Sequence, residues 1–134
     1  MTIVTSDGRQ SVDVGNADIW RALVSTILVR LPKKEKELRQ AVRFLQSGKC
    51  EAKDGLETAR SMNLVRDALS QIGPEKMVYD ASDFTKTAPW GTDISPAITS
   101  CANYFTTADG KDLLSELVGI LIYAFYAKVD VEGM

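Results

Sequence analysis

The stretch "KDLLSELVGILIYAFYAK", residues 111–128, decides the fold, because its apolar side chains cover almost the whole circumference of a helix. Leucine, isoleucine, valine and phenylalanine recur at helical spacing between Leu113 and Phe125. A helix that is apolar nearly all round is usually buried at the centre of a protein. The sequence therefore predicts a central C-terminal helix, with Asp109 as the residue that caps its first turn.

The rest of the chain predicts further helices and one hairpin. Apolar side chains recur at spacings of three and four residues and are bounded by signals such as Asn16, Gly48 and Ser95-Pro96. The β-branched residues on either side of Asp7-Gly8 predict a short hairpin. We expect one α+β domain, residues 1–134, that is predominantly α-helical, with about five helices arranged around a buried C-terminal helix and a short N-terminal β-hairpin. The other helices are expected over residues 16–31, 33–47, 54–72 and 95–105.

The charged residues are distributed unevenly along the chain. Residues 1–70 contain 12 lysines and arginines and 9 acidic residues, whereas residues 71–134 contain 4 and 9, so the two parts carry charges of +3 and −5. An acidic surface attracts a basic partner and repels nucleic acid. The same imbalance also fits a merely solvated acidic face, and the sequence leaves both interpretations open.

Compartment and membrane signals are few. The two cysteines, Cys50 and Cys101, do not form a disulfide framework in a chain of 134 residues. The first ten residues lack the charged and apolar regions of a secretory signal. The most apolar run, Leu117 to Ala127, is too short to cross a bilayer and lacks the polar face of an interfacial helix. These features predict a cytoplasmic protein that does not bind membranes.

Catalytic motifs are not found in the sequence. The chain has no histidine, which excludes Ser-His and Cys-His nucleophiles and the commonest metal ligand. It has no glycine-rich phosphate loop, and the spacing of the cysteines does not match a zinc site. Acidic residues near one another, such as Asp80, Asp83 and Asp93, are better explained as exposed loop carboxylates than as a catalytic pair. We therefore expect a protein that is not an enzyme and that holds no cofactor or metal.

Two surfaces are candidates for binding. Lys33, Lys34, Lys36, Arg39 and Arg43 form a basic helix face of the kind that contacts phosphates, although Glu35 and Glu37 are interleaved with it. The loop from Tyr79 to Asp93 combines acidic and aromatic side chains, and recognition residues concentrate on loops that a rigid scaffold holds. Trp90 either anchors a partner or folds back on the core.

The segment "PWGTDISPAITSCANYFTTADGKDLL", residues 89–114, resembles a family of bacterial polymorphic-toxin immunity proteins, immunity protein 70. The matching elements are Pro89-Trp90-Gly91, Ile94-Ser95-Pro96, Thr99-Ser100, Ala102-Asn103-Tyr104-Phe105 and Asp109-Gly110-Lys111-Asp112-Leu113. The resemblance implies a cytosolic protein that binds and neutralises one cognate toxin, often the C-terminal domain of a contact-dependent inhibition protein and commonly a nuclease. Such a protein acts stoichiometrically and without catalysis, by covering the active site or substrate groove of the toxin.

The acidic residues of the C-terminal half fit this expectation. Nuclease grooves are positively charged, so carboxylates that mimic phosphates speed association. The candidate toxin-binding residues are Asp80, Asp83, Phe84, Trp90, Asp93 and Asp109. The alternative is a small helical nucleic-acid-binding regulator that uses the basic face Lys33–Arg43.

Overall fold

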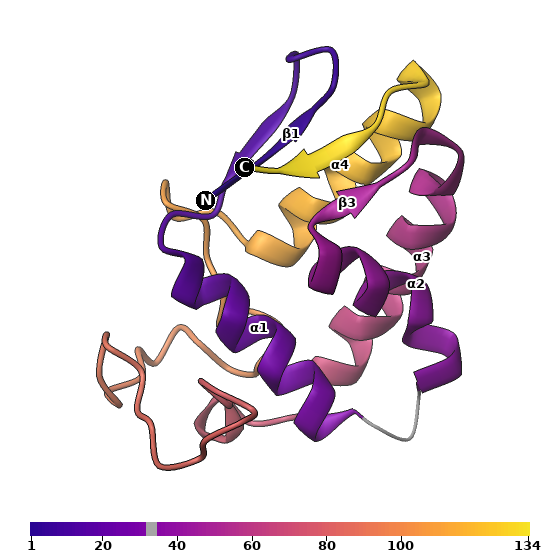
Figure 1. Ribbon diagram of the computed structural model, residues 1–134. Helices are drawn as coiled ribbons and strands as arrows, with labels where there is room; N and C mark the ends of the chain where they lie inside the picture. Colours follow the sequence, from indigo (N-terminus) through magenta and orange to yellow (C-terminus); the bar gives the residue numbers. More distant parts are fainter. Residues whose placement is uncertain (32–34) are drawn as a thin grey trace.

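The computed structural model describes residues 1–31 and 36–134 in full, and the backbone alone of Glu35. The described residues form four α-helices, a four-stranded antiparallel sheet and two short 3-10 helices (Figure 1). In chain order the elements are β1 (Thr2–Thr5), β2 (Ser11–Asp13), α1 (Ala17–Arg30), α2 (Glu35–Ser47), β3 (Lys49–Cys50), η2 (Ala52–Asp54), α3 (Gly55–Leu69), η3 (Pro74–Lys76), α4 (Leu113–Ala127) and β4 (Val131–Gly133). The expected α+β class, rich in helix, is confirmed.

The N-terminal hairpin is confirmed and belongs to a larger sheet. The carboxylate of Asp7 accepts hydrogen bonds from the Thr5 hydroxyl at 2.6 Å and the Arg9 amide at 3.1 Å, and Gly8 has a φ of +71°, which closes the turn. The strand order is β2-β1-β4-β3, so the two ends of the chain pair in the centre of the sheet. Figure 1 shows the N- and C-termini close together there.

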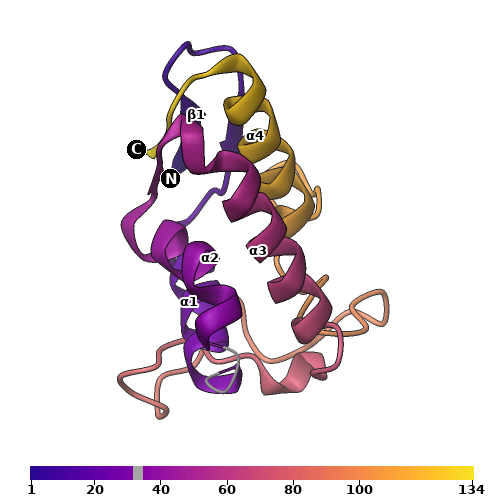
Figure 2. The same cartoon turned by 90° about the vertical axis from the view of Figure 1, so that its right-hand side faces the viewer.

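Three of the helices pack side by side as one layer. Helices α3 and α4 approach so closely that a Cβ added to Gly55 would lie 2.6 Å from the Leu121 carbonyl oxygen. On the other side of α3, the Ser61 hydroxyl accepts from the Ala41 amide of α2 at 3.1 Å. Figure 2 shows α2, α3 and α4 in this order across the molecule. Apolar side chains of the sheet and all four helices join in one core.

Helix α4 differs in part from the expected central helix. Leu113, Leu117 and Leu121 are fully buried, but Tyr126 is 71% exposed and Ile122 also reaches the surface. The helix packs against α3 on one side and also contacts β2 and β4, while one side of it reaches solvent. Its N-cap is Asp112, which accepts from the Ser115 amide at 3.1 Å, and not Asp109.

The expected helix after Ser95-Pro96 is wrong, and the chain forms a series of turns instead. Ser95 and Pro96 do begin one turn, since the Ile98 amide donates to the Ser95 carbonyl at 2.9 Å. The Asn103 side chain then accepts from the amides of Thr99 and Ser100 at 3.0 and 3.1 Å and donates to the Ala97 carbonyl at 3.1 Å. These bonds satisfy the backbone locally and compete with a helix. The number of helices is therefore four among the described residues.

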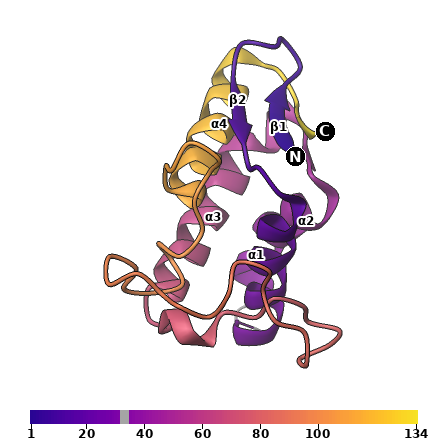
Figure 3. The same ribbon diagram turned by 90° about the vertical axis from the view of Figure 1, so that its left-hand side faces the viewer.

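Residues 70–112 connect α3 to α4 with little regular structure. Figure 3 shows the first part of this connection, coloured pink to orange, around the end of α1 that lies away from the sheet. The expected loop from Tyr79 to Asp93 lies within this part. The candidate binding residues of this loop therefore lie at the end of the molecule opposite the sheet, where α1 supports the loop.

Candidate interaction surface

Helix α1 holds the start of the candidate loop through three polar side chains. The Arg30 Nε donates to the Lys76 carbonyl at 2.9 Å. The Thr26 hydroxyl, fully buried, accepts from the Val78 amide at 2.9 Å, and the Ser25 hydroxyl accepts from the Ala81 amide at 3.1 Å. Residues 76–81 thus lie along α1 and are held there by these hydrogen bonds, so the following side chains have a fixed base.

The second part of the loop is held by the turns that replace the expected helix. The Cys101 amide donates to the Ile72 carbonyl at 2.8 Å, which ties residue 101 back to the end of α3. The Trp90 indole N–H donates to the Tyr104 hydroxyl at 2.8 Å. The loop is therefore fixed by hydrogen bonds at both of its ends, which involve residues 72–81 and residues 101–104.

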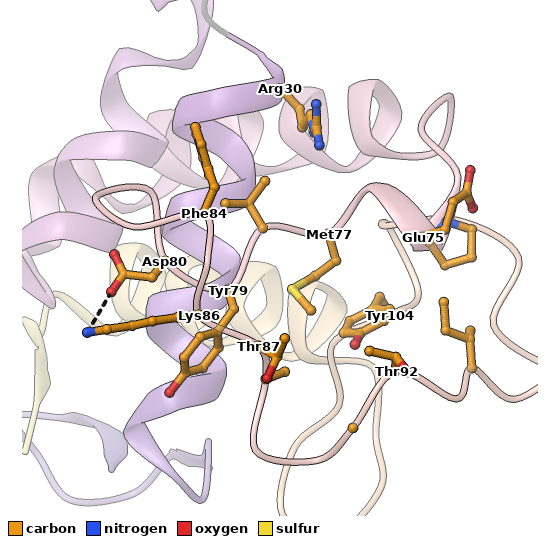
Figure 4. A pocket seen from close by; sticks show the side chains of 15 residues that line it. Arg30, Glu75, Met77, Tyr79, Asp80, Phe84, Lys86, Thr87, Thr92 and Tyr104 are labelled. Atoms are coloured by element: carbon orange, nitrogen blue, oxygen red, sulfur yellow. Dashed lines mark ion pairs between the residues drawn. The ribbon is translucent and has the colours of Figure 1, made fainter.

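A cavity of about 410 Å³ opens between the loop and the end of α1. Figure 4 shows it with Asp80 and Lys86 at one end and Glu75 and Tyr104 at the other. Its charged lining consists of two cations, Arg30 and Lys86, and two carboxylates, Glu75 and Asp80. The remaining walls are mainly apolar and aromatic, which is typical of a site that receives a ligand or a side chain of a partner. The aromatic members of the lining are Tyr79, Phe84 and Tyr104.

Two aromatic residues of the loop, Tyr79 and Phe84, line the cavity, and a third, Trp90, adjoins Tyr79. Trp90 packs edge-to-face on Tyr79, with ring centroids 5.8 Å apart and an interplanar angle of 82°. Trp90 is nevertheless 38% exposed, so it both packs on the loop and reaches the surface. Phe84 is 72% exposed. Exposed aromatic side chains on a rigid base are favoured anchors for a protein partner.

Asp80 is the buried charge of the site. Its Oδ1 accepts from the amide of Ser82 at 2.9 Å and from the Ser82 hydroxyl at 2.6 Å, and its Oδ2 lies 3.5 Å from the Lys86 Nζ. The Ser82 donors, and secondarily the Lys86 charge, hold the pKa of Asp80 below its ordinary value. Asp80 is therefore ionised at neutral pH although its side chain is only 12% exposed.

The other two acidic candidates of the loop differ from each other. Asp83 accepts from the amide and the hydroxyl of Thr85 at 3.0 and 2.5 Å, and these bonds lower the pKa of Asp83. Its first role is to close a turn. Asp93 is exposed beyond Trp90, and no donor to its carboxylate is found among the described residues. Asp93 therefore presents its full charge to solvent.

Asp109 does not belong to this group. It lines a different hollow beside β2, together with Asp13, Lys111 and Glu116. The Thr107 hydroxyl donates to the Asp109 carboxylate and lowers its pKa, and Lys111 lies 3.6 Å away. Of the six candidates, Asp80 and Phe84 line the cavity, Asp83, Trp90 and Asp93 belong to the same loop without lining it, and Asp109 lines a different hollow.

The basic face of the alternative hypothesis is described in part. Lys33 and Lys34 lie outside the described residues. Lys36, Arg39 and Arg43 are exposed along one side of α2. Arg43 borders a hollow that also contains Glu51, Asp54, Asp130 and Glu132. This neighbourhood of carboxylates weakens attraction for nucleic acid at the end of the basic face.

Some residues of the site were not predicted. Arg30 and Lys86 belong to no motif of the sequence, and Tyr104 lies in the stretch expected to form the helix over residues 95–105. The Lys86 partner is six residues away in a loop, so no helical or strand periodicity connects the two. Thr26 carried a signal, since a polar residue interrupts an otherwise apolar helix face, but nothing in the sequence identifies Val78 as its partner.

Neither of the two cysteines lines the cavity. Burial raises the pKa of the Cys101 thiol to about 11, and burial also raises the pKa of Cys50. Within residues 1–31 and 36–134 there is no group of three or more His, Cys, Asp or Glu side chains arranged to hold a metal ion. None of the helices described is long and apolar enough to cross a membrane.

A loop held by α1, with exposed aromatic side chains beside a charged cavity, has features typical of a binding surface. Comparison with protein families makes the assignment specific. The family model for Immunity protein 70 matches residues 4–132, so the chain belongs to this family. The resemblance in residues 89–114 is confirmed and extends over nearly the whole chain. No curated protein and no solved structure matches. The chain is therefore an immunity protein of a toxin–immunity system.

Proposed function

We propose that the protein neutralises its cognate toxin by stoichiometric binding, and that the surface around the cavity at residues 74–94 is where the toxin binds. The toxin is proposed to be a nuclease domain of a contact-dependent inhibition system whose active site or substrate groove is covered. The single observation that carries the choice of surface is that Phe84, Trp90 and Asp93 are exposed on a loop whose start α1 holds through hydrogen bonds, beside a cavity that Asp80 helps to line. Preorganised aromatic anchors bind partners with little entropy cost.

The charge of the surface supports a basic partner. Residues 71–100 carry four carboxylates and two lysines. Asp93 offers its charge at the rim, where it speeds association more than it adds affinity. Phe84 and Trp90 supply the area that is removed from water. The proposed interface therefore combines electrostatic steering at its edge with aromatic burial at its centre.

The test is co-expression with the toxin domain encoded by the neighbouring gene, followed by affinity purification and a growth assay. We expect a one-to-one complex and restored growth. The variant Asp93→Lys is expected to slow association, and Phe84→Ala is expected to speed dissociation, with unchanged thermal melting in both cases. The matched control variants are Glu132→Lys and Tyr126→Ala, which alter an exposed carboxylate and an exposed aromatic ring away from the cavity.

The possible results separate the parts of the proposal. If the two control substitutions weaken the complex and Asp93→Lys and Phe84→Ala do not, the interface lies at the sheet end of the molecule. Neither complex nor growth would reject neutralisation of that toxin. Salt-dependent binding of RNA or DNA by the same preparation, lost in Arg39→Glu, would favour the nucleic-acid-binding alternative.

A further inference from the structure

The carboxylate of Asp80 has one oxygen whose binding capacity is largely unused. Both donors of Ser82 go to Oδ1, at 2.9 and 2.6 Å. Oδ2 has only the Lys86 Nζ near it, at 3.5 Å, among the described residues. A charge-assisted hydrogen bond between an ammonium and a carboxylate is usually about 2.7–2.9 Å long. The pair is therefore a loose ion pair, and Oδ2 retains acceptor capacity at the end of the cavity where Asp80 lies.

Lys86 is held weakly in this position. Its side chain is 56% exposed, and Asp80 is the one ion-pair partner that the described residues give it. Only the lysine end of this pair is exposed. Lys86 loses rotamer entropy when its ammonium is fixed, and water solvates that ammonium well once it is released. Lys86 can therefore leave Asp80 at small cost. Asp80 cannot follow, because the bonds from Ser82 fix its carboxylate.

The charge balance of the cavity indicates what would replace Lys86. With Lys86 in place, two cations and two carboxylates line the cavity. When Lys86 swings into solvent, one negative charge is left without a counterion. A single incoming cation restores the balance, whereas an anion would increase the imbalance. The rings of Tyr79, Phe84 and Tyr104 in the lining add faces on which a cation can stack.

We propose that Lys86 is a placeholder, and that an arginine side chain of the toxin displaces it and binds Asp80 Oδ2 against the aromatic walls of the cavity. This inference rests on the proposed function and names the chemistry that the same surface recognises. Arginine is favoured over lysine because the guanidinium is planar, stacks on aromatic rings, is weakly hydrated and offers several donors. A substrate groove that binds phosphates supplies such side chains.

The placeholder model makes two substitutions act in opposite directions. Lys86→Ala removes the competing cation, so it is expected to tighten toxin binding by about two- to fivefold, as the strength of a loose ion pair implies. Asp80→Asn keeps the Oδ1 acceptor for Ser82 and removes the charge, so it is expected to weaken binding by about tenfold or more. Lys53→Ala and Glu132→Gln are matched controls, because each breaks a lysine–carboxylate pair that is also 3.5 Å long but lies elsewhere.

Affinities are measured by calorimetry with the toxin domain, and thermal melting is recorded for each variant. Weaker binding of Lys86→Ala would show that Lys86 itself contacts the toxin, and this result would overturn the inference. Unchanged binding of Asp80→Asn would overturn it as well. If Asp80→Asn does not fold, Asp80→Glu replaces it, and the longer carboxylate is expected to weaken binding to a smaller extent. In each of these cases, binding of the toxin domain by the parent protein would still support the proposed function.

A second arm of the experiment does not depend on the toxin. The probes are the capped tripeptides acetyl-Gly-Arg-Gly-amide, its lysine and glutamate analogues, and its leucine analogue, titrated into the isotope-labelled protein to tens of millimolar. We expect saturable shifts of the Trp90 indole and Tyr79 signals with the arginine peptide, larger in Lys86→Ala and lost in Asp80→Asn. Equal responses to all four peptides, or none, would overturn the arginine site. A positive result without toxin binding would reject the proposed function and keep the site.

Discussion

Replacing Thr26 by valine is expected to loosen the candidate loop without disturbing the helix that supports it. The two side chains have nearly the same shape, so α1 keeps its packing. The substitution removes the hydroxyl that accepts from the Val78 amide at 2.9 Å and donates to the Ala22 carbonyl at 2.7 Å. The Ala22 carbonyl keeps its helical partner. The Val78 amide, in contrast, is left in a buried place without an acceptor.

The structure sets the size of this effect. An unsatisfied buried amide costs about 1–3 kcal/mol. Unfolding entropies near 2.1 cal/mol/K per residue imply that 1 kcal/mol lowers the melting temperature of a chain of this length by about 3–4 °C. We therefore expect Thr26→Val to melt about 4–10 °C below the parent. If the loop detaches and water reaches the amide, the global loss will lie at the lower end of this range, and the local loss of order will be larger.

Two measurements together test the reasoning. Thermal unfolding followed by circular dichroism gives the global effect, and amide hydrogen exchange reports Val78 and Ala81 directly. We expect faster exchange at both amides in Thr26→Val, and near-parent exchange in Thr26→Ser, which keeps the hydroxyl. If Thr26→Val melts and exchanges like the parent, Thr26 does not hold the loop and the rigid base of the proposed surface must be abandoned.

Three further predictions follow from local geometry. Gly119→Ala is expected to stabilise the protein to urea by about 0.5–1 kcal/mol, because glycine is unfavourable inside a helix and an added Cβ meets nothing within 4 Å. Gly55→Ala is expected to destabilise it by about 1–3 kcal/mol, because the added Cβ would contact the Leu121 carbonyl. Stability changes of the same sign in both variants would contradict the α3–α4 packing. The Cys101 thiol, with a pKa of about 11, should react with a disulfide reagent at pH 8 only after denaturation, and rapid labelling of the native protein would show that it is accessible. The pKa of Asp83 is lower in the folded protein than its ordinary value of 3.8, so the ionised carboxylate stabilises the fold above pH 3.8. This contribution is lost as the pH falls through the lower pKa of the folded protein. Urea midpoints measured from pH 5 to pH 2 should therefore fall less steeply in Asp83→Asn than in the parent.

The helices that the sequence predicted well are those whose signals are local and agree with one another. Helix α1 begins after Asn16, which accepts from the Asp18 amide at 2.9 Å, and α2 ends before Gly48, whose φ is +71°. The hairpin at Asp7-Gly8 follows the same logic. Caps, turn residues and apolar spacing act within a few residues, so a single sequence contains enough information to place these elements.

Strands β3 and β4 could not be predicted from the sequence. They have two and three residues, too few for an alternating pattern, and β4 exists because it pairs with β1 across almost the full length of the chain. The turns in place of the helix at 95–105 depend on one side chain, Asn103, that bonds three backbone groups. Periodicity records which side chains are apolar and not which backbone bonds compete with a helix.

Asp109 illustrates why counting acidic residues in the sequence overstates the binding charge. Three of the four acidic candidates stand two positions from a serine or threonine, and that hydroxyl donates to the carboxylate: Ser82 to Asp80, Thr85 to Asp83 and Thr107 to Asp109. This spacing is a turn motif, and it could have been recognised in the sequence as structural. The same spacing at Asp93 and Ser95 has no such bond among the described residues, so the motif alone does not decide the role.

The contribution of each acidic residue to binding therefore depends on what each of its two carboxylate oxygens contacts. Asparagine keeps one oxygen as an acceptor and removes the charge, so Asp→Asn at positions 80, 83 and 93 separates turn closure from charge. Where the carboxylate serves mainly the turn, as at Asp83, asparagine should leave toxin binding close to that of the parent. Where an oxygen faces the cavity or solvent, as at Asp80 and Asp93, asparagine should weaken binding although the fold is kept. A uniform loss at all three positions would instead favour a diffuse electrostatic contact, in which the net charge of the loop matters and its geometry does not.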